Sequence, residues 1–154
     1  MESRDDLRKI FQTSIKINGA ILVTLIIYAV IVEIIKSQYT PFRGFVDSID
    51  MTLLRYVFYG LALFQIIIIK FIRGILLPKE ASEDLKSIFI KLNKTSIITA
   101  TLCEVPTIFG LALFLLGGYS RDFYLLLILS FFLSFLYFPR YRNWEEWIKA
   151  NAKI

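Results

Sequence analysis

One carboxylate lies in the middle of a long apolar run, where an acidic side chain is costly. Glu104 is in the sequence TATLCEVPTIFGLALFLLGG, nine residues into an expected span of about 23 residues. An acid at the centre of a membrane helix costs roughly 2.5 to 3.5 kcal/mol, so its side chain is expected to face protein or water rather than lipid. Burial there favours the neutral form of the carboxyl group. Glu104 is therefore a candidate for binding a proton, a cation or a small solute.

Residues close to Glu104 add polar groups to the same helix. Thr101 and Thr107 lie three residues to either side of it, which places them on its helical face. Pro106 has no main-chain N–H, so it is expected to kink the helix and to leave the carbonyl group of Leu102 without its usual donor. These groups together form a candidate ion site. The alternative is that protonated Glu104 only hydrogen-bonds a neighbouring helix and sets the register between the two.

Three more polar residues are expected at the depth of Glu104. Thr24, Gln65 and Ser134 belong to three other apolar runs, and each of the four residues lies about 11 to 13 positions from the expected outer end of its run. At about 1.5 Å per residue, these positions share one level of a bundle. The sequence therefore predicts a central polar layer around Glu104. Coincidence is the alternative, because every run contains some polar residues.

Four apolar runs must position these side chains. A helix needs about 20 apolar residues to cross a hydrocarbon core that is about 30 Å thick. Four segments meet this requirement, at about residues 13–35, 53–72, 95–117 and 122–138. The sequence predicts an all-α polytopic membrane protein, a bundle of four transmembrane helices that forms one membrane domain over residues 1–154. The first run is too long for a signal-peptide core and no small-residue cleavage site follows it, so we expect it to remain as a span.

Two amphipathic segments flank the expected spans on one side. Residues 82–94 and 140–152 repeat apolar side chains at helical spacing, and we expect both to lie as helices in the interface between hydrocarbon and water. The second segment contains Tyr141, Trp144 and Trp147, which are typical membrane-interface anchors. Either these aromatic residues only hold the bundle at the membrane, or the tryptophan face docks a partner.

Lysine and arginine are distributed unevenly across the expected topology. The chain has 18 of these residues and a net charge of +5; 14 of them lie on the side that holds both termini and the central connection. The other side has only Lys36, Arg43, Arg55 and Arg121. Short cytoplasmic loops carry such an excess, so we expect an integral protein of the cytoplasmic (inner) membrane with both termini in the cytoplasm. The basic face would meet the anionic headgroups of the lipid bilayer, and no nucleic-acid partner is needed to explain the charge.

The other charged residues have simpler interpretations. Glu33 is expected at the outer end of the first span, where it reaches water or pairs with Lys36 or Arg55. Asp122 is expected at a solvated loop end. Ion pairs in such exposed positions contribute little to stability.

Composition excludes several classes of protein. The chain is 56% hydrophobic and has one cysteine and no histidine, so it has neither an internal disulfide nor a conventional zinc site. Cys103 has no histidine to activate it as a nucleophile. We expect no catalytic residues, no metal and no cofactor, and we expect that the protein is not an enzyme.

Two functions remain open from these residues. Four short spans enclose little beyond their own core, so we expect a homo-oligomer or an assembly with other membrane subunits. The first function is binding or carriage of a proton, cation or small solute at Glu104. The alternative is a non-catalytic structural or assembly subunit of a larger membrane complex.

The stretch from Cys103 to Leu116 resembles the carboxylate helix of the proteolipid (c or K) subunits of rotary ATPases. In that family a mid-membrane glutamate is followed by an aromatic residue, a glycine and an apolar run, which Glu104, Phe109, Gly110 and Leu111 match here. The resemblance covers 14 of 154 residues. It implies that Glu104 binds and releases a proton or a sodium ion. The chain departs from the family in having its carboxylate in the third expected span and only Gly19 as a glycine in the first.

Overall fold

The described part of the chain is almost entirely helical. The computed structural model describes residues 2–46, 51–77, 85–142 and 144–146, and no strand occurs among them. Its four helices are, in order, α1 (Glu2–Gln38), α2 (Met51–Leu76), α3 (Leu85–Gly117) and α4 (Ser120–Leu136). The all-α class expected from the sequence is confirmed for these residues.

Three of the helices are long and apolar enough to cross a membrane. The stretches that meet this requirement are Arg8–Gln38, Thr52–Leu76 and Ser87–Gly117. The fourth helix, α4, has 17 residues, and at about 1.5 Å per residue it extends over about 25 Å, less than the hydrocarbon core of about 30 Å. Length and composition therefore support residence in a membrane through three helices.

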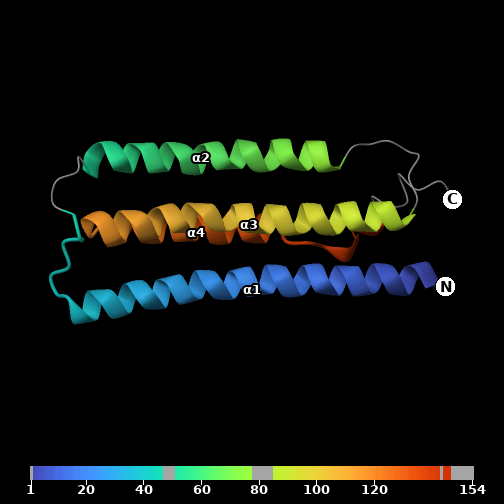
Figure 1. Ribbon diagram of the computed structural model, residues 1–154, viewed down its shortest axis with the longest axis horizontal. Coiled ribbons are helices and arrows are strands. Elements are labelled where there is room, and N and C mark those ends of the chain that lie inside the picture. The colour runs from blue at the N-terminus through green and yellow to red at the C-terminus, as the bar shows by residue number, and fades with distance from the viewer. Residues whose placement is uncertain (1, 47–50, 78–84, 143, 147–154) are drawn as a thin grey trace.

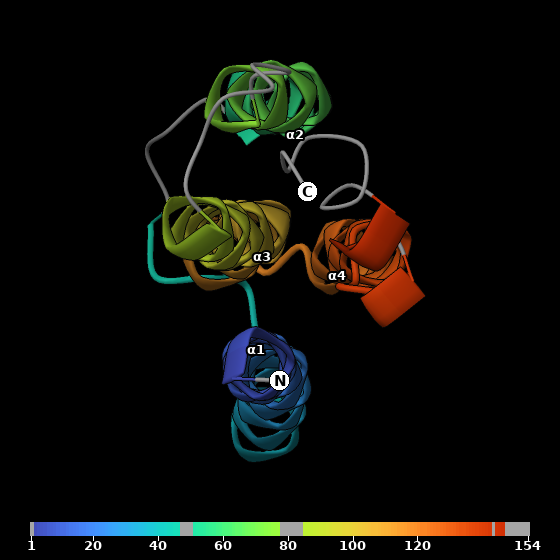
Figure 2. The same ribbon diagram turned by 90° about the vertical axis from the view of Figure 1, so that its right-hand side faces the viewer.

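The helices α3 and α4 form the centre of the bundle. Seen along the bundle, α1 and α2 lie on opposite sides of this pair (Figure 2). The helices α1 and α3 run in one direction, and α2 and α4 run in the other (Figure 1). We call the end where α1 and α3 begin and α2 and α4 finish the basic end, because it contains residues such as Arg8, Lys9, Arg73 and Arg140.

Small side chains bring α3 and α4 close together. Gly110 lies so near α4 that an added Cβ atom would be 3.0 Å from the Cα atom of Phe123. Further along the interface, the main-chain N–H of Thr107 donates a hydrogen bond to the hydroxyl oxygen of Ser130 at 3.0 Å. Membrane helices commonly pack through small and hydroxylated residues in this way, because such residues let the two backbones approach.

The connection after α1 is attached to the end of α3. The main-chain N–H groups of Phe45 and Val46 donate to the carbonyl oxygens of Leu115 and Leu116, at 2.9 and 3.2 Å. The last carbonyl groups of a helix lack partners inside it, so these bonds cap α3. Gly44 has a φ angle of 91°, and a Cβ atom there would be 2.3 Å from the Leu116 carbonyl oxygen. Only glycine fits this close approach.

The amphipathic segment expected at residues 82–94 differs from the expectation where it is described. Its first three residues lie outside the described part of the chain, and residues 85–94 are the first turns of α3 rather than a separate helix. Their apolar face is buried: Ile88 and Leu92 form a cluster with Trp144, against which Phe11 of α1 packs. This face contacts protein, because α1 extends alongside α3 to the basic end.

The segment expected at residues 140–152 is described only in part. Tyr141 is 40% exposed, whereas Trp144 is only 7% exposed. Both rings meet Phe11 edge to face, with centroids 5.2 and 5.3 Å away. Trp144 therefore holds its segment against α1 and α3. Trp147 lies outside the described residues.

Candidate functional site

Glu104 is a half-buried residue of α3 on the side that faces α1. The Tyr28 hydroxyl group of α1 lies near the Glu104 carboxyl group and interacts with it. Among the described residues, no lysine or arginine forms an ion pair with this carboxyl. Thr101, one turn earlier on α3, is exposed. The site is thus a carboxyl and a phenol that meet near the middle of two long helices, with one flank open.

Two further contacts hold α1 beside α3 on the side of the basic end. The Ser14 hydroxyl donates to the side-chain oxygen of Asn93 at 2.7 Å, and the Asn18 amide donates to the Ser96 hydroxyl at 3.2 Å. Ser14 and Asn18 are both buried. These bonds set the register of α1 against α3, which places Tyr28 at the level of Glu104.

The carbonyl group that Pro106 leaves without a donor in α3 is hydrogen-bonded from α2. Because it lacks an N–H group, the carbonyl group of Leu102 has no donor in its own helix. The side-chain amide of Gln65 donates to that carbonyl oxygen at 3.2 Å, and Gln65 is only 6% exposed. The helix α3 continues through Pro106. Gln65 therefore approaches α3 from the α2 side, whereas Tyr28 approaches Glu104 from the α1 side.

Two threonines of the expected site, Thr24 and Thr101, bond within their own helices. Thr24 and Thr101 each donate to the main-chain carbonyl oxygen four residues earlier, at 3.0 and 3.1 Å. Hydroxyl groups of this kind need no partner from another helix. Neither threonine bonds to the Glu104 carboxyl.

Thr107 and Ser134 lie in the interior. Thr107 is fully buried and Ser134 is 8% exposed, and neither hydroxyl group has a hydrogen-bond partner among the described residues. The expected polar layer is thus divided into separate contacts. The structure joins Glu104 to Tyr28 and Gln65 to Leu102, and it leaves Thr107 and Ser134 at other interior positions.

A second polar cluster lies at the end opposite the basic end. Asp122, at the start of α4, is only 3% exposed, which corrects the expectation of a solvated loop end. Its carboxyl group accepts hydrogen bonds from Arg55 at 2.9 Å and from the Tyr59 hydroxyl at 2.8 Å, both on α2. The Arg55 guanidinium also lies over the Tyr119 ring, 4.9 Å from its centroid. This cluster links α2 to α4.

Glu33 forms a more exposed link at the same end. Its carboxyl group pairs with Lys36 at 2.8 Å, as expected from the spacing of the two residues. It also accepts a hydrogen bond from the Tyr124 hydroxyl of α4. Of the three carboxyl groups that join helices, Glu104 is therefore the one that meets a tyrosine without a basic partner among the described residues.

Comparison with protein-family models, with curated proteins and with solved structures finds no match to this chain. The resemblance of residues 103–116 to the proteolipid subunits therefore stays a prediction. Among the described residues, no group of three or more His, Cys, Asp or Glu side chains could hold a metal ion.

Proposed function

We propose that this chain is an integral membrane protein that binds a proton or a small cation at Glu104. The observation that carries the proposal is the contact between Glu104 and Tyr28, made without a basic residue at mid-helix depth. A carboxyl group holds a proton in its neutral form, and its oxygen atoms can coordinate a small cation when it is ionised.

Tyr28 suits both states of this carboxyl group. A phenolic hydroxyl donates one hydrogen bond and also accepts hydrogen bonds. It can donate to the ionised carboxylate, or accept from the protonated acid by rotating its hydrogen. The pair can therefore form a hydrogen bond in either state of the carboxyl group, which lowers the cost of exchange.

The proposed topology has four spans, with the basic end in the cytoplasm. The start of α1 and the described residues 144–146 lie at the same end of the bundle (Figure 1), and 14 of the 18 basic residues belong to that side. The positive-inside rule then assigns this side to the cytoplasm of the inner membrane. The fourth span would be α4 together with the residues that follow it.

The open flank of Glu104 favours an oligomer. A carboxyl group exposed to hydrocarbon is costly even when it is neutral, because lipid tails supply no hydrogen bonds. Glu104 is half-buried, and Thr101 beside it is exposed. We propose that a second copy of the chain covers this flank.

Dicyclohexylcarbodiimide tests the protonation of Glu104, because it modifies protonated carboxyl groups in apolar surroundings. Peptide mapping by mass spectrometry should find the adduct at Glu104. Two carboxyl groups serve as internal controls: Glu33 pairs with Lys36 and Asp122 pairs with Arg55, so both should remain unmodified. Protection by Na⁺ but not by choline would identify a cation, and protection only at high pH would identify a proton.

Two variants test the chemistry in proteoliposomes. Glu104→Gln keeps the size of the side chain and should abolish both the labelling and any ion-dependent protection, with helicity unchanged. Tyr28→Phe should keep the labelling and change its pH dependence. If Glu33 or Asp122 is labelled and Glu104 is not, Glu104 is a packing residue. The alternative, a non-catalytic structural or assembly subunit, would then stand.

Disulfide crosslinking tests the covered flank. In a Cys103→Ser background, Thr101→Cys should form crosslinked dimers under mild oxidation in native membranes. Leu125→Cys is a matched control, because residue 125 is 50% exposed on α4. Crosslinks from position 101 to a different protein would replace the second copy by another membrane subunit. No crosslink above the control would contradict a covered flank.

A further inference from the structure

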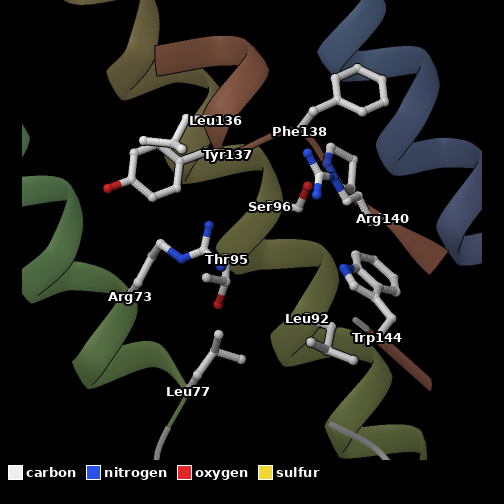
Figure 3. Close-up of a pocket in the computed structure, with 11 residues that line it drawn as sticks. Arg73, Leu77, Leu92, Thr95, Ser96, Leu136, Tyr137, Phe138, Arg140 and Trp144 are labelled. Carbon is white, nitrogen blue, oxygen red and sulfur yellow. The ribbon is translucent and has the colours of Figure 1, made fainter. Parts of the chain in front are cut away.

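A cavity opens at the basic end, far along α3 from Glu104. Its volume is about 140 Å³, much more than one water molecule needs. Three segments line it: Arg73 comes from the end of α2, Thr95 and Ser96 come from α3, and Tyr137, Arg140 and Trp144 come from the residues after α4 (Figure 3). It therefore lies where α2 and α4 end, at the basic end of the bundle.

Two guanidinium groups share this cavity without a carboxylate to neutralise them. Arg73 and Arg140 form no ion pair with any acidic residue that the structure describes. The Arg73 guanidinium lies over the Tyr137 ring, 5.0 Å from its centroid, and this contact orients the guanidinium group. Two positive charges that line one cavity attract an anion into it.

Hydroxyl groups on α3 add donors between the two arginines. Thr95 is only 3% exposed, and its hydroxyl group has no hydrogen-bond partner among the described residues. The Ser96 oxygen accepts from Asn18 at 3.2 Å, so its own hydrogen remains available as a donor. A buried hydroxyl without a partner loses hydrogen-bonding energy. An oxyanion in the cavity would restore it.

We propose that this cavity binds a phosphate group, which is carried by an anionic phospholipid or is a free phosphate ion. Guanidinium groups match phosphate oxygens in charge and in their planar, two-pronged geometry. The position favours a lipid, because basic pockets between helix ends on the cytoplasmic side suit anionic headgroups. Leu77, Leu92 and Leu136 also line the cavity, which gives the glycerol and upper acyl region an apolar wall. The site does not depend on the role of Glu104.

Native mass spectrometry of the full-length chain in detergent tests the proposal. Dioleoyl phosphatidylglycerol should bind in preference to dioleoyl phosphatidylcholine. Arg73→Gln and Arg140→Gln should each weaken binding of phosphatidylglycerol by about tenfold, as expected for loss of a charged hydrogen-bond pair. Arg142→Gln is the matched control: it removes the same charge from the same segment, but its side chain is 86% exposed and pairs with Glu146.

A measurement on the unchanged protein guards against variants that fold poorly. Phosphatidylglycerol should slow the modification of Arg73 and Arg140 by phenylglyoxal, and it should leave Arg142 unaffected. Protection by inorganic phosphate, with none from phosphatidylglycerol, would support the site and identify the free ion as its ligand. If all three arginine variants bind alike, and neither ligand protects Arg73 or Arg140, the proposal is overturned.

Discussion

The side-chain amide of Gln65 donates a hydrogen bond to the main-chain carbonyl oxygen of Leu102, 3.2 Å away on the neighbouring helix. That carbonyl group lacks a donor in its own helix because Pro106 follows four residues later. A glutamine in one apolar run thus supplies the hydrogen-bond donor that a proline removes from another. The contact fixes the axial position of α2 relative to α3.

Gln65→Leu is expected to destabilise the protein by about 1 to 2 kcal/mol, because it leaves a buried carbonyl group without a partner. The free energy of unfolding in detergent, measured by circular dichroism during titration with sodium dodecyl sulfate, checks this value. Pro106→Ala supplies the missing N–H group, so the double variant should lose much less stability through the Gln65 change. Equal losses in both backgrounds would mean that the Leu102 carbonyl is not the relevant acceptor.

Arg55→Leu should destabilise the protein by about 2 kcal/mol. It leaves the Asp122 carboxylate buried without its charged partner, and the loss is moderated because the Arg55 side chain is 40% exposed. The Asp122→Leu change should cost less when Arg55 is already leucine. A double-mutant cycle by the same unfolding titration measures this coupling, and strictly additive losses would show that the pair contributes nothing.

Gly110→Ala should destabilise the contact between α3 and α4, because the new methyl group would be 3.0 Å from the Phe123 Cα atom. Backbone atoms cannot move away as the end of a flexible side chain can. We therefore expect the free energy of unfolding to fall by about 1 to 3 kcal/mol. Gly60→Ala is the control, since no atom lies within 4 Å of the Cβ position there. Similar melting temperatures for both variants would contradict close packing at Gly110.

Cysteine labelling tests whether the short helix α4 crosses the membrane. In a Cys103→Ser background, Arg121→Cys and Arg142→Cys place thiols at exposed positions before and after α4. An impermeant maleimide added to intact cells should label position 121, and position 142 should react only after the membrane is opened. Labelling of both from the same side would leave three spans.

Depth along the helices was predictable, but rotation about their axes was not. Counting residues places Gln65, Ser134 and Glu104 in the same part of the bundle, because the rise per residue is constant. It cannot tell which neighbour each side chain faces. Gln65 contacts α3 from the side of α2, whereas Glu104 faces α1 on the other side of α3. The expected polar layer is therefore divided.

The surroundings of several other residues could not be predicted, because their partners are distant in the sequence. Tyr28 lies in an apolar run where a tyrosine carries no sign of its direction, and only the α1–α3 register brings it to Glu104. Asp122 follows a turn, which favours a solvated position, but Arg55 and Tyr59 from 60 or more residues earlier enclose it. Trp144 has the spacing of an interfacial anchor, and the length of α1 is what buries it.

The central position of α3 and α4 has a consequence for biogenesis. The first two helices to leave a ribosome lie on opposite sides of the pair that is made last (Figure 2). They cannot reach their final places as a closed hairpin, so we expect α1 and α2 to remain apart in the bilayer until α3 enters between them. The short connection after α1 then becomes attached to the end of α3 through Phe45 and Val46. The helices α1 and α2 are thus neighbours in the chain but not in the bundle, and an unfinished chain would depend on lipid or an insertase to cover its inner surfaces.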